Sequence, residues 1–146
     1  MSINNLTLTA ANSNLLIRCK GYFDQYVKIQ GFQVDNAFAA GDQTIGEVRA
    51  GIDGILSGGY VFNPADFTVY IEPNSPSKAF FSTCVNGIKD KKETAPFDFS
   101  VELPSIKKRY TFSGFLTSAP TGVSAQKMLA GVQYVFSCDN SKEEDI

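Results

Sequence analysis

One short stretch of the chain has the residue types and spacing for nucleophilic chemistry. The sequence contains no histidine, which excludes Ser-His and Cys-His nucleophile pairs, histidine general bases and most catalytic zinc sites. What remains is Ser75-Pro76-Ser77-Lys78, a Ser-x-x-Lys in which a lysine could take the proton of a serine, as in penicillin-binding enzymes. The Lys-Thr-Gly that those enzymes also need does not occur in this chain. A helix start followed by a solvated lysine is therefore the better interpretation.

The carboxylates and thiols of the sequence indicate no further catalytic site. Asp98 and Glu102 fall on the same face of a predicted strand, about 13 Å apart, which is too far for the usual pair of catalytic carboxylates. They are predicted to lie on a solvated face or to take part in a charge pattern between subunits. Cys19, Cys84 and Cys138 are widely spaced, with no Cys-x-x-Cys pair, so reduced and packed thiols are expected. We expect no enzymatic activity, no cofactor and no metal site.

Composition indicates a single domain spanning residues 1–146, with short N-terminal and C-terminal arms. The chain has 146 residues, of which 43% are hydrophobic, and a net charge of −2; this is enough for one core. The basic run Lys107-Lys108-Arg109 is short, and a pI near 5.1 argues against general affinity for phosphate. No segment approaches the roughly 20 apolar residues that a membrane helix needs, and no signal peptide is recognisable. We therefore expect no membrane partner.

Most of the chain alternates apolar and polar residues, which is the pattern of half-buried strands. The alternation is clearest in four segments: "DFTVYIEP" (66–73), "FDFSVELP" (97–104), "RYTFSGFLTS" (109–118) and "QYVFSC" (133–138). In "YVKIQGFQVD" the apolar phase slips between Ile29 and Phe32, and a β-bulge at Gly31 is predicted to explain the slip.

One segment has helical periodicity instead. Apolar residues in "NSPSKAFFSTCVNGIKDKK" recur on one helical face. Asn74 or Ser75 is predicted to cap the start, Pro76 suits the first position, and Asn86-Gly87 is predicted as the stop. The predicted fold is mainly β, an antiparallel β-sandwich or barrel with one short α-helix at about residues 75–87.

The segment "EVRAGIDGILSGGYVF", residues 47–62, contains four glycines within an apparent hairpin. Asp53-Gly54 predicts a two-residue turn, which would place Gly51 opposite Leu56 and put Gly58 and Gly59 opposite Arg49 and Val48. Glycine in a strand often marks a close backbone approach, so this hairpin is expected to contact a partner. The predicted assembly residues are Arg49, Gly51, Asp53, Gly54, Gly58 and Gly59.

The order and spacing of these segments resemble the tail tube proteins of tailed bacteriophages. The resemblance covers roughly residues 3–138: "IQGFQVDNAF", the hairpin with "GIDG", "DFTVYIEPNSPS" leading into one helix, "FSGFLTSAP" and a final "YVFSC" strand. The chain is most similar to the compact single-domain type of contractile tails. Such proteins form six-subunit rings that stack into a hollow tube, through which DNA is delivered into the host.

This resemblance implies a structural protein of the virion tail, assembled in the host cytoplasm. Implied partners are copies of the same chain and the tail sheath, baseplate and tape-measure proteins, while DNA would pass through the lumen without specific binding. Asp98 and Glu102 would then lie on the lumen wall or at ring contacts. Residues 1–5, residues 35–43 and the C-terminal tail are predicted to join stacked rings.

Two alternatives remain open from the sequence. A tail terminator with the same fold would form one ring and would not stack, and related rings occur in type VI secretion and in phage-derived contractile injection systems. A carbohydrate- or receptor-binding β-sandwich of a larger particle is the alternative from a different class. It would be expected to display exposed aromatic residues, commonly tryptophan, and this chain has no tryptophan.

Overall fold

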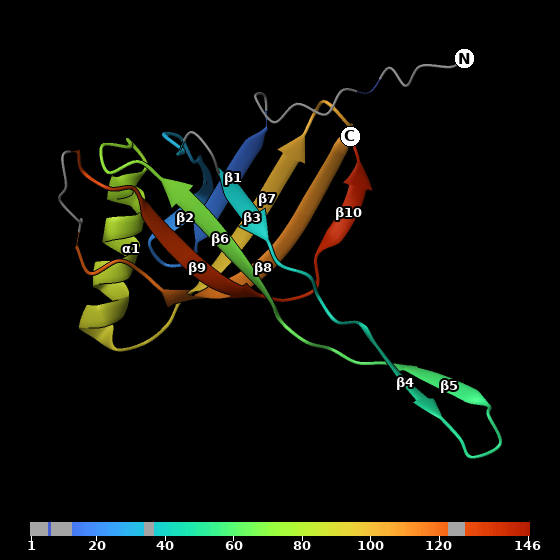
Figure 1. Cartoon of the computed structure of the whole chain (residues 1–146). Coiled ribbons are helices and arrows are strands. Elements are labelled where there is room, and N and C mark those ends of the chain that lie inside the picture. Colours follow the sequence, from blue (N-terminus) through green and yellow to red (C-terminus); the bar gives the residue numbers. More distant parts are fainter. Residues whose placement is uncertain (1–5, 7–12, 34–36, 123–127) are drawn as a thin grey trace.

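The computed structural model describes residues 6, 13–33, 37–122 and 128–146 (Figure 1). Within this part of the chain lie ten strands and one helix. The strands are β1 (Asn14–Cys19), β2 (Phe23–Lys28), β3 (Phe38–Ala40), β4 (Gly46–Ala50), β5 (Leu56–Tyr60), β6 (Ala65–Ile71), β7 (Pro96–Leu103), β8 (Lys108–Ser118), β9 (Val132–Cys138) and β10 (Lys142–Asp145). The helix, α1, spans Lys78–Lys91 and is neither long nor apolar enough to cross a membrane.

Eight of the strands form one antiparallel sheet, ordered β2-β1-β7-β8-β9-β6-β3, with β10 paired to β8. In Figure 1 the strands β6 and β9 cross over β7 and β8, so the sheet folds onto itself as two layers. Aromatic rings join the layers, because the ring of Phe99 in β7 lies 5.3 Å from that of Phe67 and 4.9 Å from that of Phe136. The predicted mainly β, sandwich-like fold with one helix is confirmed, and the sheet does not close into a barrel.

The predicted alternation is confirmed in the strands that form the core. Three strands bury every second residue: Phe67, Val69 and Ile71 in β6, Phe97, Phe99 and Val101 in β7, and Tyr134, Phe136 and Cys138 in β9. The three cysteines are free and buried, as expected for packed thiols.

The helix begins later than predicted, at Lys78, because the two serines before it bind another segment. The hydroxyl of Ser75 donates a hydrogen bond to the carbonyl of Gln30, and the hydroxyl of Ser77 accepts one from the Gln30 N–H at 2.7 Å. Ser77 occupies the N-cap position without a side-chain capping bond. These serines therefore tie the start of α1 to the chain that follows β2.

The predicted stop at Asn86-Gly87 is wrong, since the helix continues to Lys91 and ends at Lys92, whose φ is +55°. Gly87 has a packing role instead: a Cβ there would lie 2.3 Å from the ring of Tyr22. The buried face of α1 holds Phe80, Phe81, Cys84 and Val85. The Phe81 ring stacks on Tyr134 of β9 at 4.3 Å, which closes one end of the sandwich.

The bulge predicted at Gly31 is also wrong. The strand β2 ends at Lys28, and Phe32 forms a bridge with Ile71 of β6, so the change of phase marks a crossing from one edge of the sheet to the other layer. Gly31 has a φ of +73°, and a Cβ there would lie 2.9 Å from the Cα of Ser75. This crossing requires glycine for its backbone conformation and for its contact with the start of α1.

A matched pair of glycine substitutions tests that crossing. Gly21 also has a positive φ, of +94°, but nothing lies within 4 Å of a Cβ placed there. We expect Gly21→Ala to lower the free energy of unfolding by about 1–2 kcal/mol through backbone strain alone. Gly31→Ala should cost about 1–3 kcal/mol more, because it also crowds Ser75. Urea unfolding measures both; equal losses would contradict the close approach.

Candidate functional site

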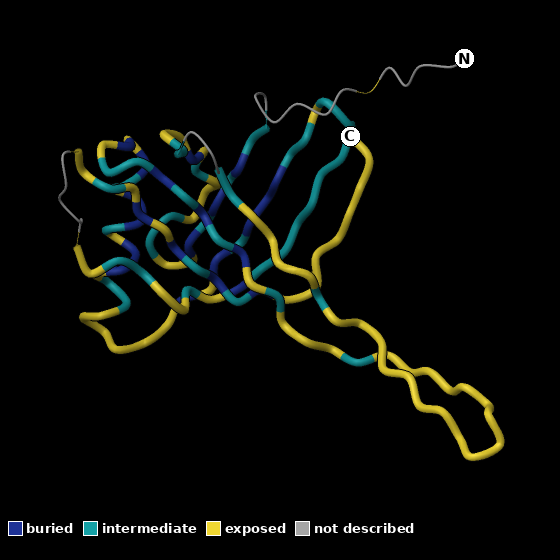
Figure 2. Tube along the Cα trace, viewed as in Figure 1, coloured by how far each residue is buried: buried dark blue, intermediate teal, exposed yellow. Residues whose placement is uncertain are grey.

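The hairpin β4–β5 projects away from the sandwich (Figure 1), and Figure 2 shows it exposed along its whole length. All ten residues of its two strands are exposed. These strands pair only with each other among the described residues, as a separate two-stranded sheet. The hairpin therefore has no core of its own and two unpaired outer edges.

The turn of this hairpin is one residue longer than predicted. The N–H of Gly51 donates to the carbonyl of Ile55 at 2.9 Å, and the N–H of Gly54 donates to the carbonyl of Gly51 at 3.0 Å. Gly54 has a φ of +81°, as the last residue of a three-residue loop requires. The Asp53 carboxylate accepts the Ile55 N–H at 3.2 Å and holds the turn.

This longer turn shifts the predicted register by one residue. Leu56 lies opposite Ala50, not Gly51, while Gly58 lies opposite Val48 and Gly59 opposite Glu47. The hairpin thus has two unlike faces, because side chains alternate along a strand. One face carries Val48, Ala50, Leu56, Gly58 and Tyr60, and the other carries Glu47, Arg49, Ser57 and Gly59.

The first of these faces, called here the apolar face, is left open to solvent. Val48 is 61% exposed, Leu56 69% and Tyr60 68%. Ile52, at the tip of the turn, is also fully exposed. Large apolar side chains grouped on one exposed element are typical of a protein–protein contact.

The glycines of β5 make no close backbone contact within the chain. Nothing lies within 4 Å of a Cβ placed at Gly59, and the nearest atom at Gly58 is the Glu47 carbonyl at 3.9 Å. The fold of a single copy therefore tolerates side chains at both positions. The close approach predicted from these glycines stays a prediction about a contact with another chain.

Hydrogen bonds at the root of the hairpin join it to the sandwich. The side-chain amide of Gln43 donates to the Asn63 carbonyl at 2.8 Å and to the Asn140 side chain at 2.7 Å. The Asn140 amide donates in turn to the hydroxyl of Tyr60 at 3.1 Å. The segments before β4 and after β5 are thereby connected to the short segment that joins β9 to β10.

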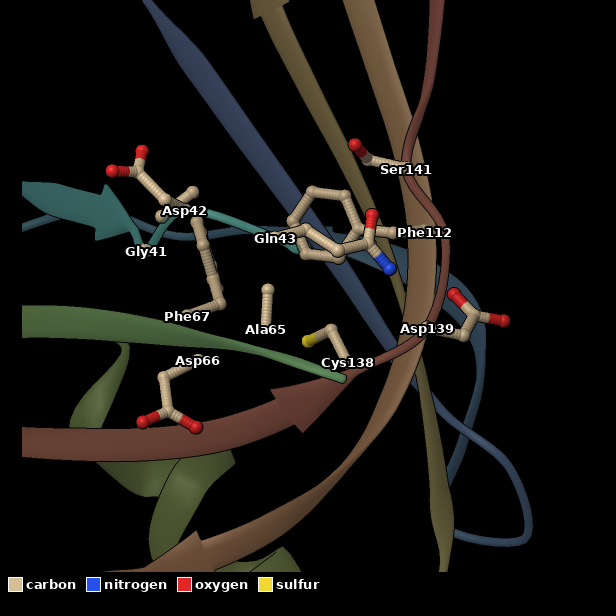
Figure 3. Close-up of a pocket in the computed structure, with 11 residues that line it drawn as sticks. Gly41, Asp42, Gln43, Ala65, Asp66, Phe67, Phe112, Cys138, Asp139 and Ser141 are labelled. Atoms are coloured by element: carbon tan, nitrogen blue, oxygen red, sulfur yellow. The ribbon is translucent and has the colours of Figure 1, made fainter. Parts of the chain in front are cut away.

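A small pocket of about 210 Å³ lies beside this root (Figure 3). Phe67 and Phe112 form part of its wall, and Asp42, Asp66 and Asp139 also line it. Within the described residues, no three acidic or cysteine side chains converge as a metal site would require. Burial raises the pKa of the Cys138 thiol to about 12, so this pocket wall holds a protonated and unreactive sulfur.

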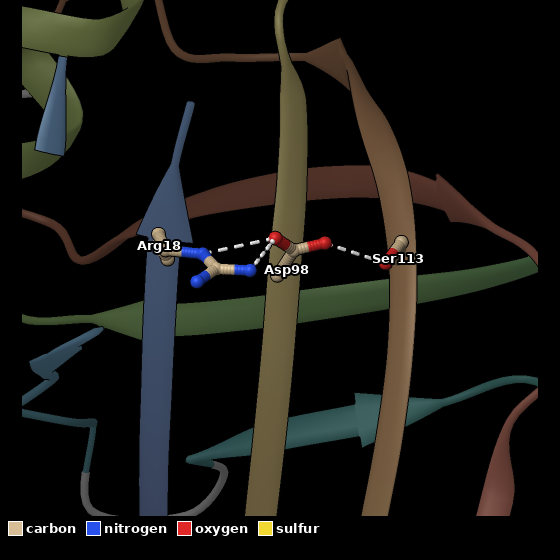
Figure 4. A network of polar contacts seen from close by, with 3 residues as sticks. All are labelled: Arg18, Asp98 and Ser113. Carbon is tan, nitrogen blue, oxygen red and sulfur yellow. Dashed lines mark hydrogen bonds and ion pairs between the residues drawn. The ribbon is translucent and has the colours of Figure 1, made fainter. Parts of the chain in front are cut away.

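The outer face of β7 carries the two carboxylates singled out from the sequence. Asp98 lies between Arg18 of β1 and Ser113 of β8 (Figure 4). Its carboxylate accepts hydrogen bonds from the Arg18 Nε at 3.0 Å and from the Ser113 hydroxyl at 2.6 Å. Burial by itself raises the pKa of Asp98, but the bonds from Ser113 and Arg18 and the charges of Arg18 and Lys20 outweigh it and lower the pKa.

Glu102 is paired in the same way. Arg109 lies directly opposite it on β8, and the guanidinium nitrogen is 3.3 Å from the carboxylate. Asp98 and Glu102 are thus partly neutralised by arginines of neighbouring strands. The sequence did not indicate Arg18, Ser113 and Arg109 as partners, because their positions depend on which strands pair. The pair of Glu102 and Arg109 could have been found, since the short connection between β7 and β8 predicts a hairpin that brings these two residues together. The assignment of both carboxylates to a lumen or a ring contact remains a prediction.

Ser75 and the segments predicted to join stacked rings are the remaining candidates from the sequence. Ser75 is buried, and its hydroxyl is engaged with the Gln30 carbonyl and the Ser77 N–H, so it serves as a link between two segments. Of the segments predicted to join stacked rings, residues 1–5 and 35–36 lie outside the described residues. The C-terminal tail forms β10 on the edge of β8.

Comparisons with known proteins give one family and a shared fold. A family model described as tail fiber protein gp32 matches residues 6–142, and the comparison with curated proteins finds no match. A chain of the anti-feeding prophage cap, the AFP tube-terminating cap, matches with a TM-score of 0.64 at 12% identity, over 100% of this chain and 95% of that one. A chain of the sheath–tube complex of an extracellular contractile injection system, PVC, in its extended state matches with a TM-score of 0.58 at 13% identity, over 90% and 88% of the two chains. At these identities the two structures show a shared fold.

Acidification tests the network around Asp98. Because its pKa is lower in the folded protein than the ordinary 3.8, these contacts stabilise the fold above pH 4 or so, and that stabilisation is lost as the pH falls through the lowered pKa. We expect Asp98→Asn to lower the free energy of unfolding at pH 7 by about 1 kcal/mol, a modest value since the side chain is partly solvated. The difference from the unmodified protein should shrink near pH 3 in urea unfolding. A difference that is the same at both pH values would contradict the role given to this carboxylate.

Proposed function

The chain belongs to the tail fiber protein gp32 family. From this membership, together with the fold shared with a chain of the PVC sheath–tube complex, we propose that it is a structural subunit that assembles with copies of itself into the rings of a phage-type tail tube. The rings contain six subunits and stack into a conduit for DNA delivery. Sheath, baseplate and tape-measure proteins are the proposed further partners. The proposed role is that of a virion tail component assembled in the host cytoplasm, without a reaction, cofactor or metal.

The observation that carries this proposal is the exposed hairpin β4–β5. An isolated two-stranded hairpin is at best marginally stable in water, yet this one exposes Val48, Leu56 and Tyr60 on a single face. Both of its outer edges are unpaired within the described part of the chain. Such edges invite pairing with another chain, and a ring of copies would satisfy all of them.

A ring also fits the asymmetry of the hairpin. Its two edges belong to different strands, β4 and β5, so a contact between the β4 edge of one copy and the β5 edge of the next joins two different surfaces. Contacts of this head-to-tail kind produce closed rings when the rotation between copies closes. The glycines Gly58 and Gly59 leave an uncovered strip of backbone on β5, against which a neighbouring strand can pack.

A tube-terminating cap is the second candidate, and one specific observation favours it. The AFP tube-terminating cap matches the whole of this chain, with a higher TM-score than the chain from the PVC complex. A tube subunit and a cap differ in one property: tube rings stack on each other, whereas a cap stops the stack. The exposed hairpin supports ring formation in both cases.

Negative-stain electron microscopy of the purified protein across a concentration series tests the proposal. We expect six-fold rings that stack into hollow tubes as the concentration rises. Single rings at every concentration would favour the terminating cap. Monomers at every concentration would contradict self-assembly and favour the carbohydrate- or receptor-binding alternative.

Two valines in place of Gly58 and Gly59 test the hairpin itself. The double variant G58V/G59V should fold as a monomer, because both positions are open in a single copy and valine favours strands. Ring formation should be lost, because the added side chains hold the neighbouring backbone away. The matched control is G122V, at a glycine that also has nothing within 4 Å of a Cβ but lies outside the hairpin. Thermal unfolding and size-exclusion chromatography are the measurements. If G58V/G59V formed rings at the same protein concentration as the unmodified protein, the hairpin would not be the assembly element.

A further inference from the structure

The last strand of the chain is attached to the sandwich only at its surface. Among the described strands β10 pairs with β8 alone, and all four of its residues are exposed. It contributes no side chain to the core. The backbone ladder to β8 and a set of contacts between charged and polar side chains hold the strand itself. The segment before it is held by Asp139, whose N–H donates to the Ser113 carbonyl at 2.8 Å and whose carboxylate accepts the Ser113 N–H at 2.9 Å.

Those contacts join acidic residues of β10 to basic and phenolic residues of β8. The ammonium group of Lys108 lies 2.5 Å from the Asp145 carboxylate and 3.4 Å from that of Glu143. The hydroxyl of Tyr110 donates a hydrogen bond to Glu143 at 3.0 Å. Ion pairs at exposed positions contribute little and are screened by salt. Elements held in this way are the first to open in a native protein.

The charges of the two strands are complementary along their length. Three acidic residues in a row, Glu143, Glu144 and Asp145, lie against Lys108 and Arg109 in register, with Asp145 opposite Lys108 and Glu144 opposite Arg109. The N–H of Ile146 extends the contact to the Lys107 carbonyl at 3.1 Å. Every copy of the chain presents the same acidic strand and the same basic edge, so a strand from another copy can make identical contacts.

The connection before β10 allows such an exchange. Both β9 and β10 pair antiparallel with β8 and follow each other along it, so residues 139–141 continue the strand direction and do not reverse it. In an extended conformation these three residues span about 10 Å. Exchange therefore requires the β8 edge of the accepting copy to lie within about this distance of the end of β9.

We propose that, in the assembled state, β10 of one copy leaves its own β8 and pairs with residues 108–111 of a second copy, a strand exchange that links neighbouring subunits. The inference rests on the proposed function in one respect, that copies of the chain assemble. Exchange replaces each contact within a copy by the same contact between copies, so it costs little and leaves no edge unpaired. In a ring or stack every subunit both gives and receives a strand, and the repeated links add to the stability of the assembly.

Pairs of cysteine substitutions on separate chains test the exchange. Thr111 of β8 lies directly opposite Lys142 of β10, and the three natural cysteines are buried. The variants T111C and K142C, one of them carrying a size tag, are mixed, assembled and treated with oxidised glutathione, which accepts the two electrons and two protons that the thiols lose. A tagged–untagged disulfide dimer on a non-reducing gel, lost on reduction, is the expected result.

Two controls test whether the disulfide reports the specific pairing of β10 with β8. The single-chain variant T111C/K142C must form its internal disulfide as a monomer, which shows that the geometry is competent. A mixture of T111C and E144C places the second cysteine two residues further along β10, roughly 7 Å away along the strand and outside disulfide reach, so the mixed dimer should be lost.

The outcome also separates this inference from the proposed function. Rings seen by electron microscopy without the tagged–untagged dimer would overturn strand exchange and leave the ring subunit intact. A dimer of equal yield in the mismatched mixture would also overturn it, because the contact would then be unspecific. Binding of β10 to a different tail protein would give rings without the mixed dimer and counts against exchange between copies.

Discussion

A two-stranded ribbon cannot bury its own apolar side chains, and this constraint governs everything outside the sandwich of this protein. Within the described part of the chain the strands β4 and β5 have no second layer, and Val48, Leu56 and Tyr60 face solvent. Gln43 and Asn140 nevertheless fix the root of the ribbon to the sandwich. The hairpin is thus anchored to the sandwich at its root, and no described part of the chain supplies the layer that it lacks.

The sandwich has a well-packed interior. Aromatic packing between β6, β7 and β9, together with α1 over one end, accounts for the core. On the outer face, Arg18 pairs with Asp98 and Arg109 with Glu102, so charges of both signs are matched across neighbouring strands. If this face lines a lumen, as the sequence resemblance predicts, Arg18 and Arg109 would be less available to DNA phosphates, because each already pairs with a carboxylate of the same chain. The hairpin differs from this sandwich in that all ten residues of its two strands are exposed.

The sequence predicted what depends on local periodicity and missed what depends on contacts between distant segments. Alternation located the buried faces of β6, β7 and β9 and the helical face with Phe80, Phe81, Cys84 and Val85. The start of α1 was displaced because Ser75 and Ser77 bind Gln30, and the helix passed through Gly87 because Tyr22 packs against it. The hairpin was predicted, but its turn gained one residue because Gly54 closes a three-residue loop. The arginine partners of Asp98 and Glu102 required the strand order, which no local pattern contains.

Hydrogen exchange at the hairpin tests the central claim most directly, that β4–β5 is completed by another copy of the chain. Backbone amides on the outer edges of residues 46–60 are unpaired in a single copy and should exchange within the fastest measurable time. In the assembled protein these amides should become strongly protected, since neighbouring strands would accept their hydrogen bonds. Assemblies in which residues 46–60 exchange as fast as in the monomer, while other surfaces become protected, would contradict the account.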